Sequence, residues 1–320
     1  MWYTILANPT KYRKKGEKNM KRLISLLLVL VVVLTALVSC GNKEKDYSLA
    51  IGVVLTEKLA SNKLTQTVAT IVTDADGKIV LCRLDCVDYT VKYGEDGTLD
   101  TNAPTSKVAL GDAYGTMPAG TWYVQGAALE SYVTGKTQAE VAAIALEGGK
   151  ATDADLVAVC SISVTDLIKA IDNAFNSEHK IAFKSSADAF TAGLSAVGAV
   201  KDTSNDEAKS VKLTETYAAS VLADGKVVAS ILDTAEAELK EITEAGAASL
   251  SYNGTKRELG ENYGAMPAGT WYVQADAYVV AANGKTADDI ATLATEGVAG
   301  CTIYAGDYKA AIEAAVVSAR

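Results

Sequence analysis

A long internal repeat constrains the fold of this 320-residue chain more than any other feature. The block Leu110–Gln125 (LGDAYGTMPAGTWYVQ) matches Leu259–Gln274 (LGENYGAMPAGTWYVQ) at 13 of 16 positions, with an offset of 149 residues. The same offset relates the tripeptide Gly-Lys-Thr at 135–137 to that at 284–286. Such self-similarity indicates that one structural unit occurs twice. Each copy, at roughly 110 to 130 residues, has the size of an ordinary domain.

Within each copy, hydrophobic periodicity predicts a β-hairpin followed by helices. Two alternating stretches flank a turn sequence rich in Asp and Gly, which is typical of an antiparallel hairpin. Stretches with helical spacing come next, and each copy ends in a short extended piece and a closing helix. We therefore expect an α+β fold with two homologous repeats, each a small antiparallel β-sheet with helices packed on one face. The predicted strands are residues 67–73, 78–87, 216–222 and 226–232, the extended pieces are 157–163 and 301–304, and the predicted helices are 122–133, 137–145, 165–175 and 307–317.

The tripeptide Gly-Lys-Thr in both copies resembles the end of a phosphate-binding P-loop. That motif needs a further glycine five residues before the glycine of the tripeptide, where this chain has Glu130 and, in the second copy, a valine. We therefore interpret the glycine as the end of one helix and the threonine as the N-cap of the next. Thr137 with Glu140, and in the second copy Thr286 with Asp289, have the spacing of a capping box.

The first forty residues have the features of a bacterial lipoprotein leader. Residues 23–38 form an apolar run of 16 residues, which is shorter than the roughly 20 that a membrane-spanning helix needs. Lys21–Arg22 precede this run, and the sequence Leu-Val-Ser-Cys-Gly at its end matches the lipobox. Cys40 is therefore the expected site of lipid attachment, and an uncleaved anchor helix is the alternative.

The predicted organisation follows from this leader and the repeat. Translation is expected to start at Met20, because codons for the preceding Lys15–Glu17 can encode a ribosome-binding sequence. The expected segments are a mis-called extension at 1–19, a lipoprotein signal peptide at 20–39, a lipid-anchored tether at 40–48, a first repeat domain at 47–180, a linker at 181–210 and a second repeat domain at 190–320.

Charge and histidine content exclude several classes of protein. The net charge is −9, and because residues 1–39 hold seven basic residues and one acidic residue, the rest of the chain carries −15. A body so acidic repels phosphate backbones, so we expect no binding to nucleic acid. His179 is the only histidine, which argues against a histidine-rich metal site. No nucleophile can be paired with a base, so we do not expect an enzyme. Because there is a single histidine, we also expect no bound metal.

The remaining candidate residues are cysteines and tyrosines. We favour buried free thiols, with a disulfide from Cys82 or Cys86 to Cys160 as the alternative. Tyr114 and Tyr263 each lie beside a glycine in a predicted loop and are candidate pocket walls. The duplicated tryptophans that follow them are interpreted as core residues, with stacking on a flat ligand as the alternative.

The order of elements resembles the FMN-binding domain of bacterial extracytoplasmic flavoproteins. That family has a Ser-Gly-Ala-Thr signature before its closing helix, and here residues 299–304 read Ala-Gly-Cys-Thr-Ile-Tyr before such a helix. The resemblance implies that FMN is attached through a phosphoester to Thr302, beside Gly300, and more weakly to Ser161 in the first copy. A flavin ring held there is expected to lie against Tyr263 or Trp271, and Tyr114 is the corresponding candidate pocket wall in the first copy.

Two functions are therefore expected from the sequence. The first is a lipoprotein on the extracytoplasmic face of the cell membrane, typical of Gram-positive bacteria, that holds flavin and passes electrons to a redox partner. The second is a surface lipoprotein without redox chemistry that binds a small ligand, a cell-wall component or a protein partner. In both, the lipid at Cys40 attaches the protein to the membrane.

Overall fold

The computed structural model describes residues 44–92, 97–187, 189–243 and 245–320. The chain divides into Met1–Glu44 and Lys45–Arg320, and only the second unit is described below. The predicted signal peptide and the lipid attachment at Cys40 lie outside the described residues. Among the described helices, none is both long enough and apolar enough to cross a bilayer.

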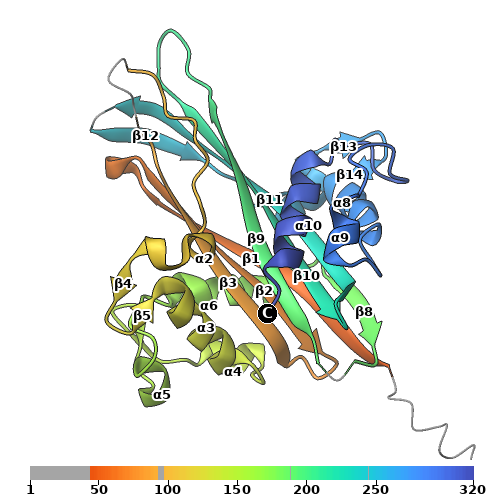
Figure 1. The fold of residues 1–320 in the computed structure, drawn as a ribbon. Coiled ribbons are helices and arrows are strands. Elements are labelled where there is room, and N and C mark those ends of the chain that lie inside the picture. The colour runs from red at the N-terminus through yellow and green to blue at the C-terminus, as the bar shows by residue number, and fades with distance from the viewer. Residues whose placement is uncertain (1–43, 93–96, 188, 244) are drawn as a thin grey trace, which may run out of the picture. The chain divides into compact units, whose positions relative to one another are not determined.

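Two four-stranded antiparallel sheets form the centre of this unit (Figure 1). The first sheet has the strand order β3-β2-β1-β8, and the second has the order β12-β11-β10-β9. In the first sheet, the strands are β1 (Lys45–Lys58), β2 (Lys63–Asp74), β3 (Ile79–Thr90) and β8 (Ile181–Ser185). In the second sheet, they are β9 (Thr191–Asp202), β10 (Val211–Ala223), β11 (Lys226–Thr243) and β12 (Gly246–Ser251).

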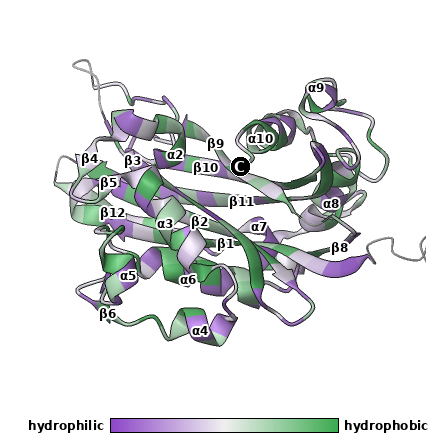
Figure 2. Ribbon diagram, turned by 60° about the horizontal axis from the view of Figure 1, so that its bottom comes forward, coloured by the Kyte–Doolittle hydropathy of each residue, from purple (hydrophilic) through white to green (hydrophobic). Residues whose placement is uncertain are grey.

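Four longer helices cover the outer faces of the two sheets (Figures 1 and 2). On the first sheet, α6 (Thr165–Asn176) packs on β1 and β2, and α3 (Trp122–Val133) packs on β3. On the second sheet, α10 (Gly306–Val317) packs on β9 and β10, and α8 (Trp271–Val280) packs on β11. The layers are therefore helix, sheet, sheet and helix.

Short elements complete the connections between these layers. The short helices are α2 (Lys107–Leu110), α4 (Gln138–Ala142), α5 (Ala154–Val157), α7 (Lys256–Leu259) and α9 (Ala287–Ile290). The 3₁₀ turns are η1 (Leu59–Ser61), η2 (Gly111–Tyr114) and η3 (Gly260–Tyr263). Two-residue strands pair as β4 (Thr116–Met117) with β5 (Gly120–Thr121), β6 (Leu146–Glu147) with β7 (Lys150–Ala151), and β13 (Ala265–Met266) with β14 (Gly269–Thr270).

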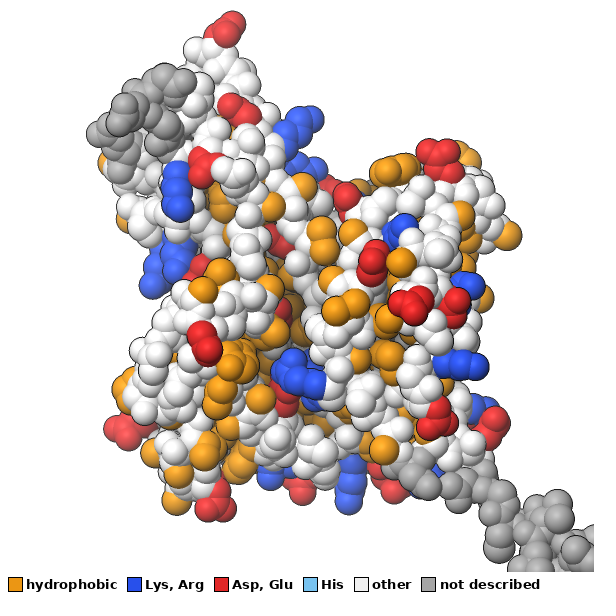
Figure 3. Space-filling model, in the orientation of Figure 1, with side chains coloured by type: hydrophobic (Ala, Val, Ile, Leu, Met, Phe, Trp, Pro, Cys, Tyr) orange, Lys and Arg blue, Asp and Glu red, His pale blue; other side chains and the backbone are white. Residues whose placement is uncertain are grey.

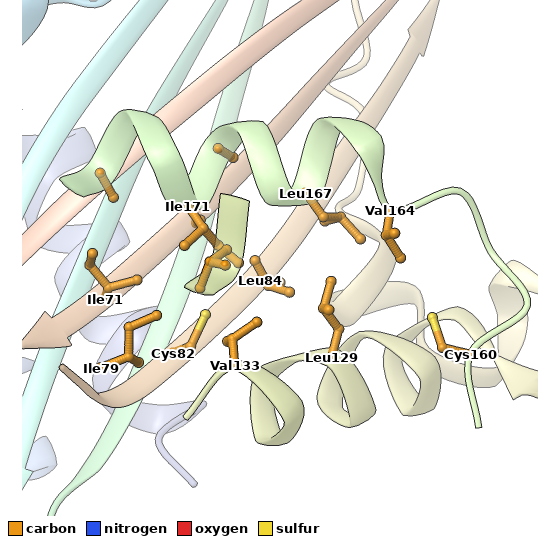
Figure 4. Close-up of a cluster of buried hydrophobic side chains, with 14 of the residues drawn as sticks. Ile71, Ile79, Cys82, Leu84, Leu129, Val133, Cys160, Val164, Leu167 and Ile171 are labelled. Carbon is orange, nitrogen blue, oxygen red and sulfur yellow. The ribbon is translucent and has the colours of Figure 1, made fainter. Parts of the chain in front are cut away.

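Successive side chains of a strand point to opposite faces of its sheet, and in the central strands both sets of side chains are mostly apolar. Both faces of each sheet are therefore buried. In β2, Ala69 and Ile71 face the helices, while Val68 and Val72 face the other sheet. Figure 4 shows the first of these faces, where side chains of the sheet meet those of α3 and α6. The second face belongs to a cluster shared by the two sheets. Each sheet therefore packs against helices on one side and against its neighbouring sheet on the other.

Two glycines allow the closing helices to pack directly on strand backbone. A Cβ atom on Gly52 of β1 would lie 2.2 Å from the carbonyl oxygen of Ala170 in α6. A Cβ atom on Gly193 of β9 would lie 1.7 Å from the carbonyl oxygen of Ala315 in α10. Because real side chains never approach backbone so closely, only glycine fits at either crossing.

The face between the two sheets also buries polar side chains. Glu215 of β10 is fully buried, and neither of its carboxylate oxygens has a hydrogen-bond partner among the described residues. Burial, with a smaller contribution from Asp85, raises the pKa of Glu215 to about 8. Beside it, the fully buried Tyr217 hydroxyl donates to the Oε1 atom of Gln66 from the opposite sheet. A protonated, neutral Glu215 is therefore the form that this core favours at neutral pH.

The structure confirms the α+β class, both hairpins and the positions of the longer helices. Thr137 and Thr286 cap α4 and α9 in capping boxes, which confirms the interpretation of the threonines. The glycines lie beyond the ends of α3 and α8, and their backbone amides donate to strand carbonyls, Gly135 to Ile79 and Gly284 to Val227.

Several features differ from expectation. β1 begins at Lys45, so the last four residues of the expected tether at 40–48 belong to a strand. The extended pieces 157–163 and 301–304 form no strand, and the expected linker at 181–210 contains β8 and β9. β9 belongs to the second sheet because it pairs along its whole length with β10.

Candidate functional site

In the second half of the unit, a carboxylate on β11 lies between two lysines. The Nζ atom of Lys212 is 2.5 Å from Oε2 of Glu236, and the Nζ atom of Lys256 is 2.9 Å from Oε1. The hydroxyl of Tyr263 donates to the same Oε1 at 3.4 Å. The Glu236 carboxylate is therefore held in one position by three side chains from three elements. We call Lys212, Glu236, Lys256, Tyr263 and the adjacent Trp271 the second lysine–carboxylate cluster.

The lysine at the start of α7 is enclosed by aromatic rings. The Nζ atom of Lys256 lies 4.8 Å from the ring centre of Tyr263 and 5.6 Å from that of Trp271, which are favourable cation–π distances. Burial alone would lower the pKa of Lys256, but Tyr263 and Glu236 outweigh it and the pKa is raised. Lys256 is therefore a fixed cation and a hydrogen-bond donor, not an amine nucleophile.

Glu236 stays ionised because the two neighbouring lysines stabilise its charged form. Burial alone would raise its pKa, but hydrogen bonds and charge from Lys212 and Lys256 outweigh burial, and the pKa of Glu236 is lowered. An ionised carboxylate next to protonated lysines has no proton to give at neutral pH. The cluster therefore fits recognition by hydrogen bonds better than general acid catalysis.

The same arrangement occurs in the first half of the unit. Asp88 of β3 lies 3.5 Å from the Nζ atom of Lys63 and 3.3 Å from that of Lys107. The hydroxyl of Tyr114 donates to Asp88 at 3.3 Å. Lys107 lies 4.9 Å from the ring centre of Tyr114 and 5.6 Å from that of Trp122. We call these five residues the first lysine–carboxylate cluster.

A buried aspartate three residues before the cluster carboxylate, on the same strand, fixes the start of each helix that carries the enclosed lysine. Asp85 accepts a hydrogen bond from the backbone amide of Val108 in α2 at 3.0 Å, and Asp233 accepts one from that of Arg257 in α7 at 3.1 Å. Burial raises the pKa of both aspartates to about 6. These contacts hold the helix starts, and with them the lysine before each amide, against the sheet.

A pocket of about 310 Å³ lies beside each cluster. The pocket beside Glu236 is lined by residues including Lys212, Glu238, Asn253, Asn262 and Tyr263. The pocket beside Asp88 is lined by residues including Lys92, Asp100, Asn102, Thr105 and Leu110. Both volumes are at the small end of the range of about 300 to 1,000 Å³ for small-molecule sites. On the face shown in Figure 3, acidic and basic side chains are interspersed, so that face has no patch of a single charge.

The residues that the flavin resemblance singles out lie elsewhere in the fold. The Oγ1 atom and the backbone amide of Thr302 both donate to Oε1 of Gln274 at 2.8 Å. Ser161 makes the same two bonds to Gln125, at 3.0 Å and 2.6 Å. Both glutamines are fully buried in α8 and α3. In this structure each hydroxyl therefore helps to attach its own segment to the helix beneath it.

Gly300 and the predicted pocket tyrosines are not brought together. Gly300 has a left-handed φ of +79° and precedes a pocket of about 250 Å³ that Thr302 and Tyr304 line. Tyr263 lines the different pocket beside Glu236, and Tyr114 belongs to the first cluster. The helix α10 begins at residue 306, so three residues lie between Thr302 and its first turn.

The four described cysteines and His179, which the sequence analysis also considered, pack against other residues of the fold. The four described cysteines, Cys82, Cys86, Cys160 and Cys301, are free and buried, and burial raises the pKa of each thiol. The ring of His179 stacks on that of Tyr272 with centres 4.0 Å apart. Within the described residues, no three metal-ligating side chains come together.

Sequence reasoning missed both lysine–carboxylate clusters, although part of the signal is visible. The tripeptide Lys-Leu-Thr occurs at 63–65 and again at 212–214, and Lys107 and Lys256 also differ by 149 residues. The carboxylates break this pattern, because Asp88 and Glu236 differ in type and are 148 residues apart.

Comparison of the chain with protein-family models, with curated proteins and with solved structures finds no match in any of the three.

Proposed function

We propose that this protein is a lipid-anchored, extracytoplasmic binding protein made of two copies of one unit, and that it binds a small molecule in the pocket beside Glu236. The occurrence of the same five-residue cluster, next to a pocket of equal volume, in both halves carries the proposal. Chance placement of one partly exposed ion pair is common, but its repetition with the same aromatic enclosure argues for a shared origin and use.

The duplication is supported by elements beyond the cluster. Both halves place three consecutive antiparallel strands, a helix that begins at a Trp, and a closing helix in the same order. Both closing helices cross the first of these strands at a glycine, Gly52 or Gly193. Both buried glutamines, Gln125 and Gln274, hold a hydroxyl residue in the segment before that helix.

A binding role follows from the fixed geometry of the cluster. Lys256 and Glu236 are already ordered by each other and by Tyr263, so a ligand that contacts them costs little side-chain entropy. The charge states of the two groups favour hydrogen bonding over proton transfer. The anchoring part of the proposal rests on the sequence around Cys40 alone.

The test is a ligand screen on the full chain purified in detergent. Thermal shift is measured with saccharides, amino acids, nucleotides and FMN, and repeated with Asn262→Ala. Asn262 lines the pocket, and its counterpart in the first half is Ala113, so the variant is expected to fold. We expect one class of ligand to raise the melting temperature of the parent and to bind Asn262→Ala at least about ten-fold more weakly. Absence of any binding, or binding unchanged in the variant, would contradict the proposal.

FMN carriage remains a prediction of the family resemblance and has its own readout. The chain is co-expressed with a flavin transferase, and visible flavin absorbance and protein mass are measured. Covalent flavin that disappears in Thr302→Ala, but persists in Asn262→Ala, would favour the redox lipoprotein over the binding protein. Colourless protein of unmodified mass would leave the binding protein as the better account.

A further inference from the structure

We infer that the ligand of the pocket beside Glu236 is a neutral saccharide. This inference rests on the proposed function and names its ligand class. The three observations behind it are the charge balance of the pocket, its mixture of donors and acceptors, and the tyrosine rings that line it.

The charges that line the pocket cancel. Two lysines, Lys212 and Lys256, lie opposite two glutamates, Glu236 and Glu238. The pKa of each glutamate is lowered, Glu238 chiefly by a hydrogen bond from Thr203, so both are ionised at neutral pH. A charged ligand would lose its hydration on entering the pocket. An anion would also be repelled by the two glutamates, and a cation by the two lysines. The negative charge of the rest of the chain adds to the exclusion of anions. A neutral ligand has neither cost.

The groups that line the pocket include both hydrogen-bond donors and hydrogen-bond acceptors, so they complement a ligand that can both donate and accept. Carboxylates only accept and ammonium groups only donate, whereas an amide side chain such as that of Asn262 does both. Hydroxyl groups are the neutral groups that satisfy all three partners. A ligand with several hydroxyls on one small frame can therefore pair with Glu236, Lys212 and Asn262 without leaving a polar group unsatisfied.

The rings and the size of the pocket select among polyhydroxy compounds. Tyr252 and Tyr263 line the pocket and are both partly exposed, and Lys256 lies over the ring of Tyr263. A sugar ring presents C–H groups on one face and hydroxyls at its edge, which matches aromatic carbon beside charged and amide groups. The volume of about 310 Å³ suits one or two such rings and is small for a dinucleotide or a flavin with its ribityl phosphate.

The experiment compares sugars that share a ring and differ in charge. Binding to the full chain in detergent is measured by calorimetry for D-glucose, N-acetyl-D-glucosamine and maltose. Matched charged probes are D-glucuronate, D-glucose 6-phosphate and D-glucosamine. We expect at least one neutral sugar to bind about ten-fold more tightly than every charged probe, and to bind Asn262→Ala about ten-fold more weakly than the parent.

A charge variant tests the reason for this preference. Glu238→Gln makes the lining net positive, and Thr90 at the equivalent place in the first half shows that a neutral residue is tolerated there. We expect the ratio of neutral-sugar to glucuronate affinity to fall by several-fold in Glu238→Gln and to stay unchanged in the exposed control Glu57→Gln.

The outcomes separate this inference from the proposed function. Binding of a charged probe, an amino acid or a nucleotide that is lost in Asn262→Ala, without binding of any neutral sugar, would overturn the inference and leave the proposed function standing. Failure of every class of ligand to bind would overturn both. A neutral sugar that binds Asn262→Ala as tightly as the parent would place the sugar site outside this pocket and overturn the inference.

Discussion

The buried carboxyl of Glu215 makes a sharp prediction about stability and pH. Its pKa is raised from 4.5 to about 8 in the folded protein, mainly by burial. Between these two values the unfolded chain releases a proton that the folded chain keeps. Stability from this group is therefore fully present below pH 4.5 and is lost as pH rises through about 8.

The size of the effect follows from the two pKa values. Each pH unit between them costs about 1.4 kcal/mol, so at pH 7 this group alone lowers the free energy of unfolding by roughly 3 kcal/mol. Replacing Glu215 by glutamine removes the titration. Glutamine has nearly the same shape as glutamate. The fold also accepts it at the equivalent place in the first half, where the counterpart of Glu215 is the equally buried Gln66.

Urea unfolding followed by tryptophan fluorescence measures the prediction. The stability of Glu215→Gln minus that of the parent should increase by about 1.4 kcal/mol per pH unit between about pH 5.5 and 7.5. Asp233 also has a raised pKa, but it is present in both proteins and cancels in the difference. Asp85, whose pKa is raised to about 6, is coupled to Glu215 and makes a smaller contribution to the measured difference. Glu57→Gln, at an exposed position of β1, serves as the surface control for the loss of one carboxylate. A pH-independent difference for Glu215→Gln would refute the reasoning.

Further predictions concern packing, the segment before α10, and the thiols. Gly52→Ala should lower the free energy of unfolding by on the order of 3 kcal/mol, because its Cβ would lie 2.2 Å from the backbone of Ala170. Gly126→Ala, which has ordinary contacts of 3.4 Å and an alanine counterpart, should instead be neutral or stabilising by about 0.5 to 1 kcal/mol in the same urea assay. Gln274→Ala removes the acceptor that holds the segment before α10, so limited proteolysis should cut near Tyr304 faster than in the parent; equal rates would show that the contact is dispensable. The four buried cysteines should resist a thiol reagent in the native protein and react in urea, and rapid native labelling would contradict their burial.

The elements that could be predicted from the sequence are those with a clear period or cap. The hairpin of β2 and β3 alternates around an Asp-Gly turn, and Thr137 begins α4 with a capping box. β1 gives no such signal, because its central residues 49–55 are apolar or glycine without alternation. β9 is rich in alanine and glycine, which have low strand propensity, and it becomes a strand through pairing with β10.

The site was less predictable than the fold for a physical reason. Lys107 and Asp88 come from a helix start and a strand that only tertiary packing brings within 3.3 Å. Tyr263 was found because a tyrosine beside glycine in a loop is often exposed to a pocket, and it does line one. Thr302 was selected by resemblance to a motif, and a motif carries no information about the buried Gln274 that accepts its hydrogen bonds.

The buried contact between the two sheets has a consequence for how such a chain could arise. Residues of both sheets form one shared apolar cluster, so either sheet alone would leave that inner face in water. An ancestor with a single copy would have needed a second molecule to cover it. The duplication that we propose would therefore have joined the subunits of a homodimer into one polypeptide. After such a fusion the two pockets would no longer have to stay identical, which agrees with an aspartate beside one and a glutamate beside the other.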